Sequence, residues 1–192
     1  MLRSFAAAIC LGLLLAACDS GGSKFKNTDI TGADYARGFT LTDHNGKPRT
    51  LADFRGKAVI VFFGFTRCPD VCPTTLLELK QVMQKLGPDA EKVQVLFITL
   101  DPPRDTAAVL AQYVPAFDSR FLGLYGDADA TSKTAKEFKV YFEKRAGSAP
   151  DSYSVDHTSA SFAFDPAGRI RLYVRHDQVA TLVDDIRTLI KE

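Results

Sequence analysis

The sequence has no marked excess of either charge and no long block of like charges. Among its 192 residues, 24 are basic and 23 are acidic, which leaves a formal net charge of +1. Proteins that bind nucleic acid through its phosphates carry a basic patch or a strongly positive domain. The charge balance therefore excludes nucleic acid as an expected partner. Internal repeats are also absent, and the length and the 46% hydrophobic content fit one globular domain with a short extension.

The sequence also lacks an apolar run long enough to cross a membrane. The apolar stretch at residues 5–17 is shorter than the ~20 residues that a spanning helix needs, and it fits the apolar part of a secretory signal. It ends in Leu-Ala-Ala-Cys, which resembles the lipobox of bacterial lipoproteins. We therefore expect residues 1–17 to be a lipoprotein signal peptide and Cys18 to be lipidated. The alternative is an ordinary signal or anchor with an accidental cysteine.

The residues after the predicted lipid anchor predict a tether. Residues 18–37 are rich in Gly, Ser, Asp, Asn and Lys, and at ~3.3 Å per residue they would reach roughly 60 Å when extended. Asp19 resembles the signal that retains lipoproteins in the inner membrane, so we expect the protein on the periplasmic face of that membrane. The folded domain is then expected at residues 38–192.

Cysteine is scarce, which limits the thiol chemistry of the mature chain. Of four cysteines, Cys10 lies in the predicted signal peptide and Cys18 would carry lipid, so only Cys68 and Cys72 remain. An exported compartment is oxidising and permits a disulfide. A bridge across so short a loop restrains the unfolded chain little, which makes it a poor structural staple. The pair is therefore expected to act as a redox pair or as two ligands of a metal.

Local patterns predict an α/β domain. Continuous apolar runs predict buried strands, at residues 57–65 and 93–100. Apolar residues at helical spacing predict helices, at residues 74–86, 106–113, 128–138 and near the C-terminus with Asp177 as cap. Further strands are expected at 121–125 and 140–144, and turn residues at 45–46 and 165–168 predict hairpins. We therefore expect a thioredoxin-like mixed sheet flanked by helices, with an N-terminal β-hairpin.

In this layout the two cysteines lie where the first central strand passes into its helix. Positions i and i+4 share a helix face, so both sulfurs can point in one direction. Because proline is tolerated only in the first turn, we expect the regular helix to begin at Pro73 after a looser turn. The helix amino end and the neighbouring Arg67 favour thiolate over thiol. Both disulfide exchange and metal binding require thiolates.

Only three histidines are available to complete a metal site. His44 precedes a hairpin turn and is expected to be solvated, and His176 is expected on the surface. His157 lies before a central strand, where thioredoxins place a cis-proline facing the dithiol, and residues 157–164 contain no proline. We expect His157 to be a metal ligand. The alternative is a structural histidine satisfied by Asp156 or by the backbone.

Two thiolates and one imidazole favour copper. Structural zinc prefers four protein ligands and iron–sulfur clusters usually need four cysteines, so the number of ligands disfavours both. Cu(I) accepts two or three soft ligands, and Cu(II) adds nitrogen. An open site also suits a carrier that must release its ion. Zinc is the second choice of metal.

Three motifs together, "FTRCPDVCP", "TLDPPRDT" and "VDHT", resemble the Sco/SenC family of copper chaperones for cytochrome c oxidase assembly, from about Gly38 to the end of the chain. The resemblance implies a thioredoxin-like domain that binds one copper through Cys68, Cys72 and His157. It implies delivery to the CuA centre of oxidase subunit II, with another periplasmic copper carrier as a candidate donor. The family is also discussed as a thiol-disulfide reductase that keeps the CuA cysteines reduced.

The resemblance also extends to Asp101 and Arg104, which match the family's segment after the second central strand and are expected to shape the loop beside the site. The alternative is an ordinary helix start with Asp105 as its cap. Asp70, between the cysteines, has no assigned role.

Three other classes share parts of this pattern. A plain thioredoxin-type reductase usually carries two residues between its cysteines and a cis-proline, and both features are absent here. A peroxiredoxin needs Pro seven and Thr three positions before its reactive cysteine, and neither cysteine here has them. The alternative function of a redox-sensing lipoprotein that docks to a signalling partner remains open. This alternative predicts that loss of His157 leaves the behaviour of the thiols unchanged.

Overall fold

The computed structural model describes residues 24–148 and 152–192. The predicted signal peptide and Cys18 lie outside these ranges, so both remain predictions. Within the described ranges, no helix combines the length and the apolar character that crossing a membrane requires.

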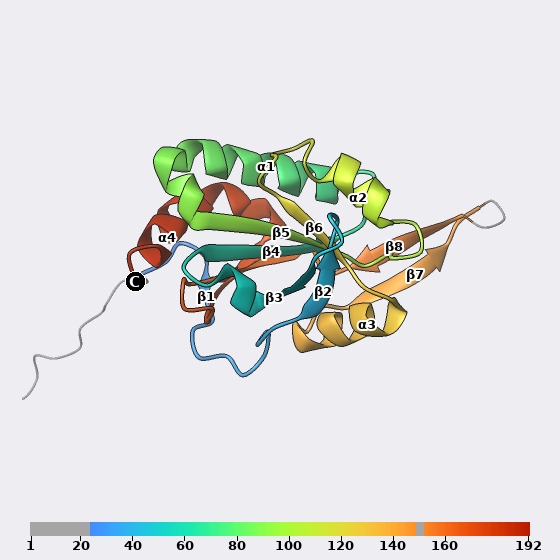
Figure 1. The fold of residues 1–192 in the computed structure, drawn as a ribbon, viewed down its shortest axis with the longest axis horizontal. Coiled ribbons are helices and arrows are strands. Elements are labelled where there is room, and N and C mark those ends of the chain that lie inside the picture. The colour runs from blue at the N-terminus through green and yellow to red at the C-terminus, as the bar shows by residue number, and fades with distance from the viewer. Residues whose placement is uncertain (1–23, 149–151) are drawn as a thin grey trace, which may run out of the picture.

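A mixed eight-stranded sheet forms the centre of the molecule (Figure 1). Its order is β1-β10-β9-β4-β5-β6-β2-β3. The middle strands β4, β5 and β6 are parallel, and the other pairs are antiparallel. The strands are β1 (Thr28–Asp29), β2 (Thr40–Asp43), β3 (Pro48–Thr50), β4 (Ala58–Gly64), β5 (Val93–Thr99), β6 (Leu122–Tyr125), β9 (Ala160–Phe164) and β10 (Ile170–Arg175).

Two further strands, β7 (Phe142–Ala146) and β8 (Tyr153–His157), pair only with each other. This β7–β8 ribbon projects from the main body (Figure 1). The strand expected near residues 140–144 therefore exists, but it lies outside the main sheet.

Helices cover both faces of the sheet, as the sequence predicts. Helices α1 (Val71–Leu86) and α4 (Leu182–Leu189) pack together on one face, with α2 (Ala107–Tyr113) beside α1. Helix α3 (Ala128–Glu137) covers the other face (Figure 1). Three short 3-10 segments complete the connections, η1 (Leu51–Phe54), η2 (Gly87–Lys92) and η3 (His176–Thr181).

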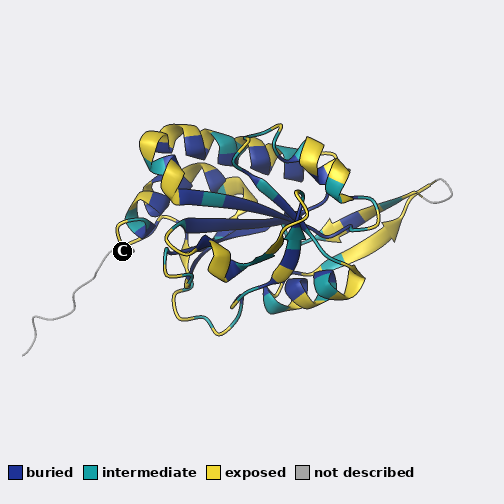
Figure 2. Ribbon diagram, viewed as in Figure 1, coloured by how far each residue is buried: buried dark blue, intermediate teal, exposed yellow. Residues whose placement is uncertain are grey.

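The core lies along the central strands (Figure 2). All seven residues of β4 are buried, because helices cover both faces of this strand. Aromatic rings from several elements pack edge to face around it, including those of Phe63, Phe138 and Phe162. The continuous apolar run in the sequence therefore indicates a strand with no solvent-facing side.

The chain before the N-terminal hairpin differs from the prediction of a tether. Phe25 is 4% exposed, and β1 adds to the edge of the sheet beside β10. The Asn27 amide groups donate to the Asp185 carboxylate of α4. The expected boundary at Gly38 is therefore corrected, since the folded domain includes the segment from Phe25 onward.

Three local predictions need correction. Helix α1 begins at Val71 instead of Pro73, and Pro73 fits within the first turn, where the amide has no helical partner. Thr106 caps α2 in place of Asp105. Asp177 pairs with Arg175 instead of capping the last helix.

Candidate metal centre

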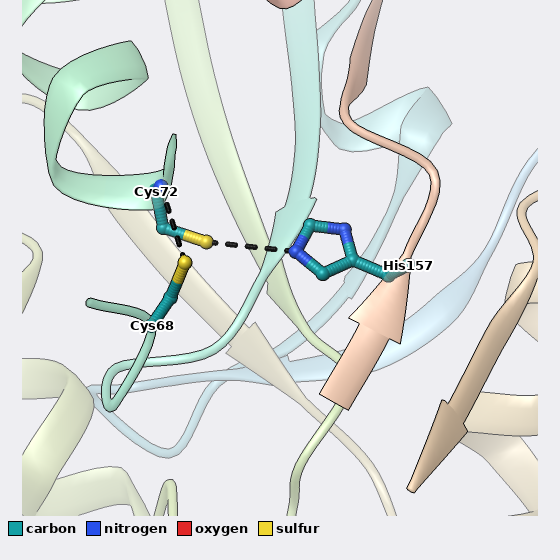
Figure 3. Close-up of side chains that lie close together, drawn as sticks. All are labelled: Cys68, Cys72 and His157. Atoms are coloured by element: carbon teal, nitrogen blue, oxygen red, sulfur yellow. Dashed lines mark hydrogen bonds between the residues drawn. The ribbon is translucent and has the colours of Figure 1, made fainter. Parts of the chain in front are cut away.

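The two cysteines flank the start of α1. Strand β4 ends at Gly64, the chain turns through residues 65–70, and Cys72 lies in the first turn of the helix. Cys72 is fully buried, whereas Cys68 is half-buried and open to one side. The Cys72 amide points at the Cys68 sulfur at 3.4 Å (Figure 3). The helix amino end thus stabilises negative charge on Cys68, as its place in the sequence predicts.

Space for the Cys72 sulfur depends on Gly64. A Cβ atom at this position would lie 2.8 Å from the Cys72 Sγ and 2.8 Å from the Phe97 ring. The sequence analysis did not single out Gly64. A glycine that ends a β-branched and aromatic strand is nevertheless a signal of close approach by another group.

The His157 ring reaches the dithiol from the end of β8. Its Nε2 lies 3.7 Å from the Cys72 Sγ (Figure 3). Its Nδ1 lies 3.0 Å from the Thr158 carbonyl oxygen, which can only accept, so Nδ1 carries the proton. The lone pair of Nε2 therefore faces the sulfurs, in the tautomer that a metal ligand needs. Asp156 does not satisfy this ring, because its carboxylate pairs with Arg145.

Folding brings the three predicted ligands together. The candidate ligand atoms of Cys68, Cys72 and His157 all lie within 4.8 Å of one another. No further His, Cys, Asp or Glu of the described residues joins this group. The site therefore offers two sulfurs and one nitrogen.

The two thiols are inequivalent. A hydrogen bond from the Cys72 thiol lowers the pKa of Cys68 to about 4, against the opposing effect of burial. The backbone amides of Asp70 and Cys72 act in the same direction. The hydrogen bond to Cys68, together with burial, raises the pKa of the Cys72 thiol. In the metal-free dithiol, Cys68 is therefore the thiolate and Cys72 keeps the proton.

Asp101 and Arg104 lie beside the site, where the resemblance places them. Asp101 is fully buried and forms an ion pair with Arg104. Tyr153 of β8 donates its hydroxyl to the Asp101 carboxylate at 2.6 Å, and the Arg104 Nη1 donates to the Tyr153 carbonyl at 2.8 Å. The sequence analysis missed Tyr153, because only the fold shows that it shares a strand with His157.

Asp105 holds the loop that carries the thiols. Its buried carboxylate accepts from the Thr66 amide at 3.0 Å, from the Thr66 hydroxyl at 2.5 Å and from the Thr99 hydroxyl at 2.6 Å. The alternative of Asp105 as a helix cap is therefore wrong, since the Thr106 side chain accepts from the Val109 amide in that position.

The other two histidines do not join the site. The Nδ1 of His44 accepts from the Gly123 amide at 3.0 Å, and burial lowers the pKa of this ring. The expectation of a solvated residue at His44 is therefore wrong. His176 is exposed, as expected.

The fold and the site define a class, the thioredoxin-like proteins that place a histidine beside a dithiol at a helix start. The family model described as SCO1/SenC matches residues 27–191. This chain belongs to the SCO1/SenC family.

Relatives and solved structures agree with this assignment. The mouse mitochondrial protein SCO2 homolog is 41% identical over 152 residues, which cover 78% of this chain and 60% of that relative. The solution structure of apo Sco1 from Thermus thermophilus has a TM-score of 0.77 at 40% identity, and covers 86% of this chain and 96% of that one. Copper-bound ScoI of Bradyrhizobium japonicum has a TM-score of 0.73 at 37% identity, and covers 79% and 97%. The chain spans 56–60% of the length of its mammalian SCO2 relatives from mouse, cattle and human.

Proposed function

We propose that this protein is a copper chaperone that binds one copper ion through Cys68, Cys72 and His157. It delivers this ion to the CuA site of cytochrome c oxidase subunit II. The observation that carries the proposal is the convergence of two sulfurs and an imidazole nitrogen within 4.8 Å. The structures of ScoI from Bradyrhizobium japonicum and of yeast Sco1 with copper bound support the choice of metal. The oxidase target follows from the family resemblance.

The donor set fits copper as a cargo. Two soft sulfurs suit Cu(I), and the unprotonated Nε2 of His157 adds the nitrogen that Cu(II) favours. A structural zinc site would need a fourth protein ligand, which the described residues do not supply here. An incomplete set of protein ligands leaves a position from which an acceptor can begin to bind the ion.

We further propose that Cys18 anchors the protein by lipid to the periplasmic face of the inner membrane. Lys24 is the first described residue, and six residue steps separate it from Cys18. At ~3.3 Å per residue this segment spans at most about 20 Å, instead of the roughly 60 Å expected for a longer tether. The folded domain would therefore work close to the membrane that holds its acceptor. Another periplasmic copper carrier is the candidate donor.

The test compares copper binding by His157→Ala with binding by His176→Ala, which changes an exposed histidine outside the site. The reduced wild-type protein and the control are expected to bind about one copper, with a sulfur-to-copper charge-transfer band. His157→Ala should lose more than the roughly 10-fold in affinity that removal of an outer partner of a metal ligand costs. Unchanged affinity and an unchanged band in His157→Ala would exclude copper carriage by this trio and favour the redox-sensing alternative.

The inequivalent thiols favour a second candidate function, reduction of disulfides in the acceptor. The Cys68 thiolate, which is accessible, would attack one acceptor sulfur and release the other as a thiolate. Cys72 would then give up its proton to the released acceptor thiolate, attack the Cys68 sulfur and displace the acceptor sulfur still bound to it, which leaves a Cys68–Cys72 disulfide and a reduced acceptor pair. The two electrons thus pass from the chaperone dithiol to the acceptor.

Anaerobic mixing with an isolated, oxidised CuA domain separates the two functions. Copper transfer from the loaded protein supports carriage. Restoration of acceptor thiols by the metal-free reduced protein supports the reductase function.

A further inference from the structure

The dithiol and the imidazole come from separate parts of the fold. Cys68 lies in the turn before α1 and Cys72 in its first turn, whereas His157 ends the projecting β7–β8 ribbon (Figure 3). Because β7 and β8 form no backbone ladder with the main sheet, pairing within the sheet does not fix the ring against the sulfurs. The two-residue link from His157 to β9 holds the base of the ribbon near the sheet, and side-chain contacts complete the placement of the ring.

One loop contacts both parts. This loop, residues 100–106 between β5 and α2, contains two fully buried carboxylates, Asp101 and Asp105. Asp105 binds the amide and the hydroxyl of Thr66, in the turn that leads to Cys68. Thr99 links the Asp105 carboxylate to the backbone of Asp101, because its hydroxyl donates to Asp105 and accepts from the Asp101 amide at 2.9 Å.

Asp101 binds the ribbon instead of the thiol turn. It pairs with Arg104 and accepts from the Tyr153 hydroxyl, while Arg104 donates to the Tyr153 carbonyl. The Arg104 guanidinium also stacks on the Tyr153 ring, 3.6 Å from its centroid. Since side chains alternate along a strand, Tyr153 and His157 lie on the same face of β8, four residues apart.

We propose that Asp101, Arg104 and Tyr153 are positioning residues that hold His157 at the dithiol, whereas Asp105 holds the dithiol turn. The loop at residues 100–106 thus sets the two halves of the site separately. The consequence for copper ligation rests on the proposed function, but the placement of the ribbon does not. Loss of the ribbon contacts should free the imidazole while both sulfurs keep their places.

Tyr153→Phe tests this inference with a small change. It removes the hydroxyl that binds Asp101 and keeps the ring on Arg104. The matched control is Tyr141→Phe, which removes a hydroxyl that binds Glu143 at the exposed side of the ribbon. A second variant, Arg104→Lys, keeps the charge and loses the forked contacts to Asp101 and to the Tyr153 carbonyl.

In the metal-free reduced protein, Tyr153→Phe should speed hydrogen exchange of the β8 amides by about 10-fold, which corresponds to loss of one hydrogen bond. With Cu(II) bound, its nitrogen hyperfine coupling should weaken while the sulfur-to-copper band stays. Copper affinity should fall by about 10-fold, as for other outer partners of metal ligands. Arg104→Lys should act in the same direction, and Tyr141→Phe should match the wild type in all three measurements.

Wild-type exchange and wild-type nitrogen coupling in both Tyr153→Phe and Arg104→Lys would overturn the inference. Equal loss of the sulfur band and the nitrogen coupling would also overturn it, because the two halves would then not be held separately. If His157→Ala leaves copper binding unchanged while Tyr153→Phe still speeds β8 exchange, the copper function fails and the positioning of the ribbon stands.

Discussion

At the scale of single residues, the position of the Cys72 sulfur depends on the lack of a side chain at Gly64. Gly64 ends β4, and the Cys72 sulfur occupies the place that a Cβ would approach. The Phe97 ring closes the same space from β5. Both neighbours are fully buried, so neither can move without disturbing the core.

Gly64→Ala is therefore expected to displace the Cys72 sulfur. The overlap should cost about 1–3 kcal/mol of unfolding free energy, as overpacking of a core usually does. It should also weaken copper binding, because the sulfur turns away from His157. Urea unfolding and copper titration would measure the two effects. Gly38→Ala is the control, since a Cβ there meets nothing within 4 Å, and equal results for both variants would contradict the argument.

At the scale of elements, two hairpins use the same turn chemistry. In the β2–β3 hairpin, Asp43 accepts from the amides of Asn45 and Lys47 and from the Arg49 guanidinium. In the β9–β10 hairpin, Asp165 accepts from the amides two and four residues later and from the guanidinium of Arg169. In each hairpin, the carboxylate at the first turn position thus accepts hydrogen bonds from turn amides in place of backbone carbonyl groups. These hydrogen bonds fix the register of the hairpin.

The second turn makes stability depend on pH. Burial raises the pKa of Asp165, but hydrogen bonds from Arg169 and Arg171 and the charge of Arg169 outweigh it and place the pKa below the ordinary 3.8. The unfolded state therefore binds the proton more readily, so this contribution is present above that pH and is lost as the pH falls below it.

Asp165→Asn should lower the unfolding free energy by about 2 kcal/mol near neutral pH, since it removes hydrogen bonds to a charged group. The difference from the wild type should shrink at an acidic pH below the ordinary carboxyl pKa of 3.8, as the wild-type carboxylate gains its proton. Urea unfolding at both pH values would measure it. Asp177→Asn, at an exposed ion pair, should show no such pH-dependent difference. A constant difference for Asp165→Asn across the range would show that its charge is not responsible.

At the scale of the whole molecule, the N-terminal segment completes the fold. It adds β1 to the sheet edge and buries Phe25 against the core. It also joins Asn27 to Asp185 of α4, so the first and last parts of the domain are tied together. The sheet edge at β1 and the β7–β8 ribbon lie at opposite ends of the molecule (Figure 1).

A chain that begins at Gly38 should therefore be less stable than one that begins at Lys24. Loss of the Phe25 ring alone should cost about 3–5 kcal/mol of unfolding free energy. Thiol reactivity at neutral pH should stay unchanged in the shortened chain while it is folded, because the dithiol lies far from this edge. Guanidinium unfolding and thiol alkylation would measure the two quantities. Equal stability of both chains would instead support the domain boundary at Gly38 that the composition predicts.

Much of the site was predictable because its signals are local. The spacing of Cys68 and Cys72, their place after an apolar run and the lack of proline near His157 all lie in short stretches of sequence. Several errors concern residues whose partners are distant. The alternative of Asp105 as a cap stayed open, because sequence alone does not show that Thr66, 39 positions earlier, donates to its carboxylate.

By itself, the sequence determined the mixed α/β class, the buried central strands and the candidate ligands, because residue periodicity and spacing act over one strand or one turn. Only the tertiary structure decided that Cys72 and His157, 85 positions apart, lie 3.7 Å from each other. It also decided that Asp101 and Tyr153 hold the ribbon and that Phe25 belongs to the core. The physical reason is that burial and long-range hydrogen bonds depend on which elements pack together. The composition of the sequence near a residue does not specify that packing.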